Sequence, residues 1–420
     1  MTITEHPEKR RRAAPPPAAI PQDLLLSEVL PRLPAKHLAR FKCVCRSWRA
    51  AVESDPAFVR RHLELSRAAP PCILVIPCEE FYNDDDDDDD DDDGAMSGEI
   101  SFHRLILGEA PGTADVELVF DKSWPEGIAH GVLPTHCDGL VAVATAADQI
   151  FVCNPATREF VALPPGSRDV LDVKAPAAAL GYDPLRNRYV VARYFYRKYD
   201  LSKDVASGAL SLDYEIGHET FTLGSGGGDG CWEPTADPPH AIGPARPVCT
   251  REAFYWCTAV RRPSALLRFS LRDRAFDVVP CPPGADYVHG VDHLTELAGK
   301  PCYVQPATET AFDFWVADDD GGPRPEWTLR CRVDFADYGP SVGSDALSVV
   351  AAVGDEMMIA ADHRNLYSCD GRRRKGARLL VDMEEELAYE RPDGSTYDGE
   401  LLHHVVPYVE SLVSIGKCNY

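Results

Sequence analysis

The hydrophobic pattern of this 420-residue chain changes period near residue 70, and this change constrains the fold more than any other feature. Before it, over residues 20–65, apolar residues recur at the spacing of amphipathic helices. After it, short alternating apolar runs end in Pro, Gly, Asn or Asp, as in "ALLRFSLRDRAFDVVPCPP". We therefore expect an α+β multidomain chain, in which a small N-terminal all-α helical bundle precedes a large all-β domain.

The strand-like units recur at intervals of roughly 40 to 50 residues, which is typical of propeller blades of about four strands. This spacing predicts a propeller-like domain over residues 70–415, for which we expect about six blades. We expect its Gly- and Pro-rich middle, residues 198–245, to be irregular.

Two segments have the composition of disordered chain. Residues 1–18 combine "EKRRR" with a Pro/Ala run, and this leader is either a solvated tail or a nuclear import signal. Ten consecutive aspartates, Asp84 to Asp93, repel one another and predict a disordered loop over residues 83–98.

The net charge of −24 argues against nucleic acid or an anionic membrane as a partner, because both require clustered Lys and Arg. The N-terminus has no apolar signal-peptide core, and no run of residues is long enough to predict a membrane span. The 14 cysteines are scattered singly, as expected for small buried side chains in a reducing compartment. We therefore expect a cytoplasmic or nuclear protein, or one found in both compartments.

Cys43 and Cys45 do not predict a metal or redox site. A zinc site needs about four ligands, usually in C-x₂₋₄-C pairs, and nearby histidines do not complete a set. Leu38, Phe41 and Cys45 instead follow helical spacing, which predicts one continuous helix with Cys45 in the core.

The segment "IPQDLLLSEVLPRLPAKHLARFKCVCRSWRAAVESDPAFVRRHL" resembles an F-box, which we place at residues 19–66. The resemblance implies docking onto a Skp-type adaptor and, through it, a cullin–RING ubiquitin ligase, with the Val and Trp positions mainly building the bundle. Exposed apolar side chains at Pro21, Leu24, Leu30 and Pro34 would form the interaction patch. From the residues alone, a bundle packed on its own chain remains the alternative. The adaptor-binding candidates are Ile20, Pro21, Leu24, Leu25, Val29, Leu30, Leu33, Pro34, Leu38, Phe41, Val44 and Trp48.

The segments "CDGL", "CNPATR" and "GYD" resemble the F-box-associated, kelch-like region of plant F-box proteins, with Pro407 to Ile415 as its closing strand. The resemblance implies that loops on one propeller face bind a target protein. Candidate contacts are Tyr194, Tyr196, Trp315 and Arg372 to Arg374. The Asn-Pro-x-Thr residues predict a local turn closed by the Asn side chain and the Thr hydroxyl.

No motif predicts catalysis or a cofactor. "GSGGGDG" opens no helix and lacks the lysine of a phosphate-binding loop, and neither His289 with His293 nor His403 with His404 has the setting of a metal site. We expect a non-catalytic substrate-recognition subunit of a Skp–cullin–F-box ubiquitin ligase, which binds a protein for ubiquitination. The alternatives are a scaffold that acts without the ligase and a propeller that binds a carbohydrate or metabolite.

Overall fold

The structure, a computed structural model, places most of the chain. It describes residues 20–416 except 70–71, 80–95, 111, 130–133, 145–148, 171–177, 204–209, 225–229, 244, 251, 260–264, 286–291, 319–323, 344–345, 372–375, 391–393, 395 and 398–399. The expected leader, the aspartate run, His289 and Arg372 to Arg374 lie outside the described residues.

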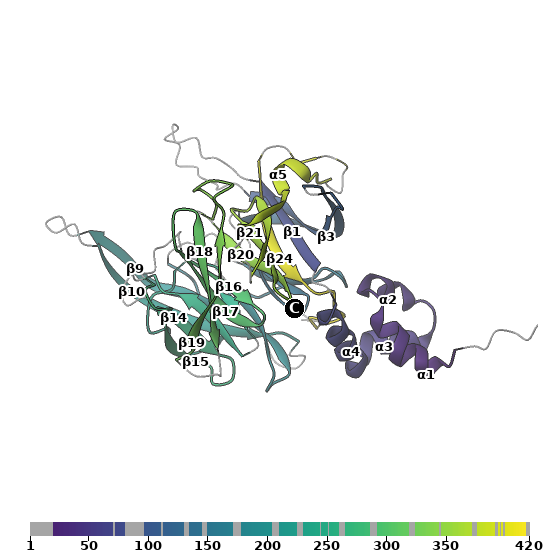
Figure 1. The fold of residues 1–420 in the computed structure, drawn as a ribbon. Helices are drawn as coiled ribbons and strands as arrows, with labels where there is room; N and C mark the ends of the chain where they lie inside the picture. Colours follow the sequence, from purple (N-terminus) through teal and green to yellow (C-terminus); the bar gives the residue numbers. More distant parts are fainter. Residues whose placement is uncertain are drawn as a thin grey trace, which may run out of the picture.

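Short helices form a bundle at one side of a large β domain (Figure 1). The first helical segment begins after Pro21, whose fixed φ suits a helix start, and Asp55 caps the last helix by accepting from the Ala57 and Phe58 amides. The bundle comprises α1 (Gln22–Leu24), a π-helix η1 (Leu25–Val29), a 3₁₀ turn η2 (Leu30–Arg32), α2 (Ala35–Phe41), α3 (Arg46–Ser54) and α4 (Pro56–Arg67).

The predicted continuous helix through Cys45 is wrong. α2 ends at Phe41, and a turn over residues 42–45 separates it from α3. Cys45 has an extended backbone just before α3, and both Cys43 and Cys45 are exposed rather than buried. Among the described residues, no group of three or more Cys, His, Asp or Glu could hold a metal ion.

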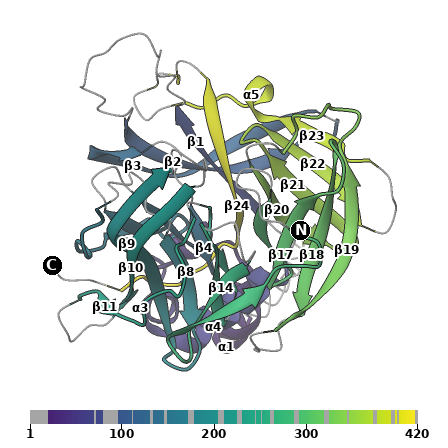
Figure 2. The ribbon, with the colours of Figure 1, turned by 90° about the vertical axis from the view of Figure 1, so that its left-hand side faces the viewer.

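Six four-stranded antiparallel sheets form the ring of a β-propeller, which confirms the expected fold (Figure 2). Their innermost strands, β4, β8, β12, β16, β20 and β24, contact one another around the centre. The first three sheets are β24 (Leu401–Tyr408) with β1 (Cys72–Glu79), β2 (Met96–Leu107) and β3 (Ala114–Ala129); β4 (Thr135–Cys137), β5 (Leu140–Ala144), β6 (Ile150–Asn154) and β7 (Glu159–Ala162); and β8 (Ala178–Asp183), β9 (Arg188–Lys203), β10 (Leu210–Thr222) and β11 (Glu233–Pro234).

The other three sheets continue the same order from the centre outward. They are β12 (Val248–Cys249), β13 (Ala253–Cys257), β14 (Ala265–Ser270) and β15 (Ala275–Pro280); β16 (His293–Leu297), β17 (Lys300–Pro306), β18 (Ala311–Asp318) and β19 (Glu326–Asp334); and β20 (Leu347–Val353), β21 (Glu356–Ala361), β22 (Asn365–Asp370) and β23 (Arg378–Asp382), followed by the short helix α5 (Met383–Glu386).

Three expected boundaries differ from the structure. Residues 96–98, expected in the aspartate loop, begin β2. Much of the stretch expected to be irregular, residues 198–245, belongs to the long hairpin of β9 and β10. The closing strand, expected at Pro407 to Ile415, is β24 and ends at Tyr408.

Residues far apart in the sequence close the ring. β24 pairs with β1 from Cys72 opposite Tyr408 to Glu79 opposite Leu401, so the first sheet takes its innermost strand from the C-terminal part of the chain. Closing the ring pairs strand edges that would otherwise be open to aggregation.

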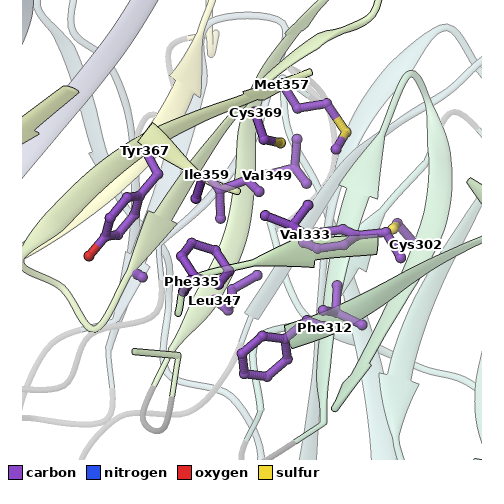
Figure 3. Close-up of a cluster of buried hydrophobic side chains, with 14 of the residues drawn as sticks. Cys302, Phe312, Val333, Phe335, Leu347, Val349, Met357, Ile359, Tyr367 and Cys369 are labelled. Atoms are coloured by element: carbon purple, nitrogen blue, oxygen red, sulfur yellow. The ribbon is translucent and has the colours of Figure 1, made fainter. Parts of the chain in front are cut away.

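Apolar side chains of neighbouring sheets pack between the blades. Figure 3 shows one such cluster, in which Phe312, Phe335 and Leu347 lie close together. Phe335 packs edge-on against Tyr367, with ring centroids 5.1 Å apart. Among the residues that the structure describes, no helix is long and apolar enough to span a bilayer.

Buried histidines make the stability of the propeller depend on pH. Burial lowers the pKa of His103 and His403 to about 4 and that of His218 to about 3, against about 6.5 for an unperturbed histidine. Below pH 6.5 the unfolded chain therefore binds more protons than the folded chain. The free energy of unfolding of the protein should therefore fall as the pH drops from about 6.5 towards 4.

The variant His218→Asn should weaken this pH dependence, because the unfolded chain then binds up to one proton fewer. An Asn amide can take the place of His218 Nδ1, which lies 2.5 Å from Thr235 Oγ1. Urea unfolding between pH 4.5 and 7.5 should show a slope smaller by up to about 1.4 kcal/mol per pH unit. His37→Asn, on the exposed side of α2, is the control, and equal slopes in the two variants would contradict this prediction.

Candidate adaptor-binding surface and the opposite propeller face

The bundle carries an exposed apolar surface on its outer side. Ile20 is 60 % exposed, Leu24 50 %, Val29 41 % and Val44 60 %. Gln22 Nε2 donates to Ser47 Oγ, which ties the start of α1 to the start of α3, next to the turn that carries Val44. Four large apolar side chains exposed on so small a bundle are typical of an interaction site.

The π-helix η1 separates outward from inward leucines. The Leu30 amide donates to the Leu25 carbonyl, the five-residue bond that widens a helix. Leu26 and Leu30 then pack into the bundle core, whereas Leu24 and Val29 remain outside. A single π-helical turn of this kind is frequent at functional sites.

The structure brings only part of the predicted adaptor set to this surface. Leu30 is 2 % exposed and forms part of the core, so its expected place in the patch is wrong. Val44 is exposed, so it does not help to build the bundle, whereas Trp48 does, with its ring 5.6 Å from that of Phe41. Ile20, Pro21, Leu24, Val29, Pro34 and Val44 are exposed; Leu25, Leu33, Phe41 and Trp48 are half-buried; and Leu30 and Leu38 are buried.

The inner side of the bundle rests on residues 409–416, which follow β24 and which we call the C-terminal strap. Leu412 packs into the core of the bundle, together with Leu30, Leu38 and Phe58. Val413 and Ile415 pack instead into the core of the propeller, in a cluster that includes Leu63 of α4. The strap therefore joins the two cores, and sequence periodicity gave no sign of it.

Polar contacts hold the strap from both sides. Glu410 accepts from the Ala35 amide at the start of α2, 3.0 Å away, and forms an ion pair with Arg104 of β2. Glu159 accepts from the Ile415 amide, at 2.8 Å. Gly139 has a φ of +84° and lies so close to the strap that a Cβ would come within 2.3 Å of the Val409 carbonyl oxygen.

Asn154, in the Asn-Pro-x-Thr turn, has two roles. Its Oδ1 accepts from the Ala156 and Thr157 amides, as the turn prediction requires. Its Nδ2 donates to the strap carbonyls of Ser411, at 3.2 Å, and Val413, at 2.8 Å. The expected local bond from the Thr157 hydroxyl is wrong, because that buried oxygen has no hydrogen-bond partner among the described residues.

Two further contacts fix the bundle on the propeller. Arg67 Nε of α4 donates to Asp138 Oδ1 in the turn between β4 and β5, at 3.0 Å. Lys36 Nζ of α2 lies 2.7 Å from Glu117 Oε1 of β3. The bundle thus contacts one face of the ring, where the β4–β5 and β6–β7 turns lie.

The hairpin of β9 and β10 extends from the opposite side of the ring (Figure 1). A bulge at Arg197 shifts its register, after which Tyr199 lies opposite Tyr214, and Leu201 opposite Leu212. These side chains share one face of a two-stranded ribbon that projects past β8 and β11, with Tyr199 37 % and Leu201 56 % exposed.

The predicted target-binding aromatics are not loop residues on this face. Tyr194 and Tyr196 are buried, and their hydroxyls donate to the Gly243 and Ile242 carbonyls, so their expected exposure is wrong. Trp315 is half-buried against the core near Tyr303. The sequence pattern does not single out Tyr199 and Leu201, because only the bulge reveals which side of the ribbon they occupy.

Comparison with known proteins matches both parts of the chain. Residues 20–60 match the F-box domain, and residues 117–337 match the F-box associated beta propeller domain, which covers more than half of the chain. The chain belongs to the F-box associated beta propeller family. Both resemblances found in the sequence are thereby confirmed, and we call the bundle the F-box from this point on.

Relatives of this F-box protein occur in Arabidopsis thaliana. One F-box protein is 26 % identical over 331 residues, which cover 77 % of this chain and 83 % of the relative. An F-box/LRR-repeat/kelch-repeat protein is 24 % identical over 400 residues, which cover 92 % and 95 % of the two chains. The crystal structure of TolB from Acinetobacter baumannii covers 84 % of this chain and 72 % of its own, at 9 % identity and a TM-score of 0.42, too distant a likeness to add further support.

The variant Asn154→Asp separates the two roles of Asn154. Aspartate can still accept both turn amides, but an oxygen replaces the amide that donates to the Ser411 and Val413 carbonyls. Three buried oxygens would then face one another, so we expect a loss of about 2 kcal/mol or more in the free energy of unfolding. We also expect faster proteolytic separation of the F-box from the propeller.

Asp183→Asn is the matched control for this experiment. Asp183 makes the same turn in the next sheet, accepting from the Leu185 and Arg186 amides, and none of its described contacts is with the strap. The Asp183→Asn substitution should leave the rate of proteolytic separation of the F-box from the propeller unchanged. A stability of Asn154→Asp equal to that of the wild type would mean that Asn154 serves the turn alone.

Proposed function

We propose that this protein is the substrate-recognition subunit of a Skp–cullin–F-box ubiquitin ligase. The observation that carries the proposal is the division of the F-box into two sides. Its inner side is occupied by Leu412 and the rest of the strap, whereas its outer side leaves Ile20, Leu24, Val29 and Val44 exposed. The outer side is therefore the side that receives a Skp-type adaptor, and the adaptor provides the link to a cullin–RING ligase.

The target protein binds on the propeller, on the side away from the F-box. The ribbon of β9 and β10 extends there, with Tyr199 and Leu201 as exposed apolar contacts. Aromatic and aliphatic side chains of this kind serve as anchors in protein interfaces. In this arrangement the subunit is not itself an enzyme, since the transfer of ubiquitin takes place on its partners. It acts in the cytoplasm, in the nucleus or in both.

The double variant Leu24→Asp, Val29→Asp should abolish most adaptor binding. Both side chains are exposed, so the F-box can fold, but two charges would have to be buried in the interface. Titration with a purified Skp-type adaptor should show a dissociation constant at least about 30-fold higher, the equivalent of about 2 kcal/mol. Thermal unfolding should match that of the wild type.

Leu201→Asp is the matched control, because it places a charge at an equally exposed leucine on the ribbon. It should bind the adaptor as the wild type does. Substitution of Leu30 is unsuitable for this test, because Leu30 is buried beside Leu412 and its loss would disturb the fold. Wild-type protein that is folded but does not bind the adaptor would refute the proposed function, and so would a double variant that binds normally.

A further inference from the structure

A small cavity lies at the centre of the propeller, between the innermost strands. It has a volume of about 50 Å³, and its polar lining includes Arg246 before β12, His136 of β4, Thr295 and Glu296 of β16 and Ser348 of β20. One buried water needs roughly 10 to 15 Å³ by this measure. The cavity therefore has room for a few waters or one small anion, but not for a sugar or a nucleotide.

Arg246 has no partner for its charge in the described part of the chain. No described residue accepts a hydrogen bond from its guanidinium or forms an ion pair with it. Burial lowers the pKa of Arg246 to about 10, so it remains charged at neutral pH. A charge that is partly removed from water without a counter-ion is costly, and proteins rarely retain one without a purpose.

Three other arginines of the propeller, two buried and one exposed, each have a carboxylate as partner. Arg193 lies opposite Glu219 on the neighbouring strand, with 3.3 Å between Nε and Oε1. Arg268 lies opposite Asp277, and Arg332 opposite Asp313, with ion pairs of 3.2 Å and 2.6 Å. In each case the ladder of the sheet supplies the carboxylate. Arg246 precedes a strand of only two residues, β12, and so has no such cross-strand partner.

Three of the remaining polar groups of the cavity can donate hydrogen bonds to an anion. Burial, together with the charge of Arg246, lowers the pKa of His136 to about 4, so His136 is neutral at pH 7 and can donate from one ring nitrogen. The Ser348 hydroxyl is a further donor, and Thr295 Oγ1 already accepts from the Val349 amide, which leaves its own proton to donate. Glu296 is the one carboxylate in the described lining, and it accepts from the Gly299 amide in the turn after β16.

We propose that this central cavity binds a small phosphate-type oxyanion, held by Arg246 with His136, Thr295 and Ser348 as further donors. The oxyanion is either a free ion or the phosphate group of a larger molecule, the rest of which would lie outside the cavity. The site is separate from the adaptor surface, so binding can be tested on the purified full-length chain without an adaptor.

The test is thermal unfolding in inorganic phosphate, against chloride of the same ionic strength and pH. Wild-type protein should gain about 2 °C or more in melting temperature, in a saturable manner. Arg246→Gln should lose this response, and in chloride it should melt no lower than the wild type, because it lacks the unpaired charge. Arg332→Gln, which removes an arginine that already has a partner, should respond to phosphate as the wild type does.

Two results would overturn the proposal. One is a wild-type melting temperature that does not respond to phosphate. The other is an equal rise in the melting temperature of the wild type and of Arg246→Gln in phosphate, which would mean that phosphate acts only through its general exclusion from protein surfaces.

Phosphoserine, as a second probe, identifies the source of the oxyanion. A rise in melting temperature with both phosphoserine and inorganic phosphate, which is lost in Arg246→Gln, would support the phosphate group of a larger molecule as the ligand. A rise with inorganic phosphate alone would support a free ion. Because no adaptor is present, either result is independent of whether the F-box binds one.

Discussion

The C-terminal strap is the constraint on which the rest of the structure depends. The chain first closes the ring, by pairing β24 with β1, and then continues between the propeller and the F-box. Leu412 enters one core, whereas Val413 and Ile415 enter the other, so that a single extended segment completes both. Some of these contacts join residues more than 300 positions apart, as in the bond from Ala35 to Glu410. Neither part can reach its final packing until the end of the chain is in place, a feature of slowly folding topologies.

The strap also removes a conflict between two interpretations of the bundle. A helical unit of about 45 residues buries too little surface to be stable alone, so packing on its own chain and docking onto a partner looked like alternatives. The strap packs on Leu30, Leu38 and Phe58 and so supplies the burial that the bundle needs to be stable, without covering the outer residues. The F-box can therefore be held on the propeller and still expose Leu24 and Val29. Its orientation is fixed further by the ion pair of Arg67 with Asp138.

The sequence predicted what depends on local periodicity and missed what depends on irregular backbone. The change of period near residue 70 correctly indicated a helical bundle followed by an all-β domain, and the recurring strand-like units correctly indicated a propeller, which has six blades. Spacing could not reveal the turn before α3, because Cys45 still falls at a helical interval from Leu38 although the helix has ended. Likewise, one bulge residue, Arg197, decides which face of the ribbon carries Tyr199. Asn154 was correctly predicted to make a turn, but its bonds to the strap join residues about 260 positions apart and leave no local pattern.

The up-and-down order of the strands gives the two faces of the ring separate tasks. In the β4 sheet the turn after the first strand and the turn after the third lie at the same end. These turns carry Asp138, bound to Arg67, and Ala156, packed on the F-box core. The hairpin after the second strand lies at the other end, where β9 and β10 extend away from the F-box (Figure 1). The length of that hairpin can therefore vary without disturbing the strap, because no turn on the F-box side changes with it. The proposed target surface on this face can thus diverge while the attachment of the F-box stays the same, which is the separation that a substrate receptor requires.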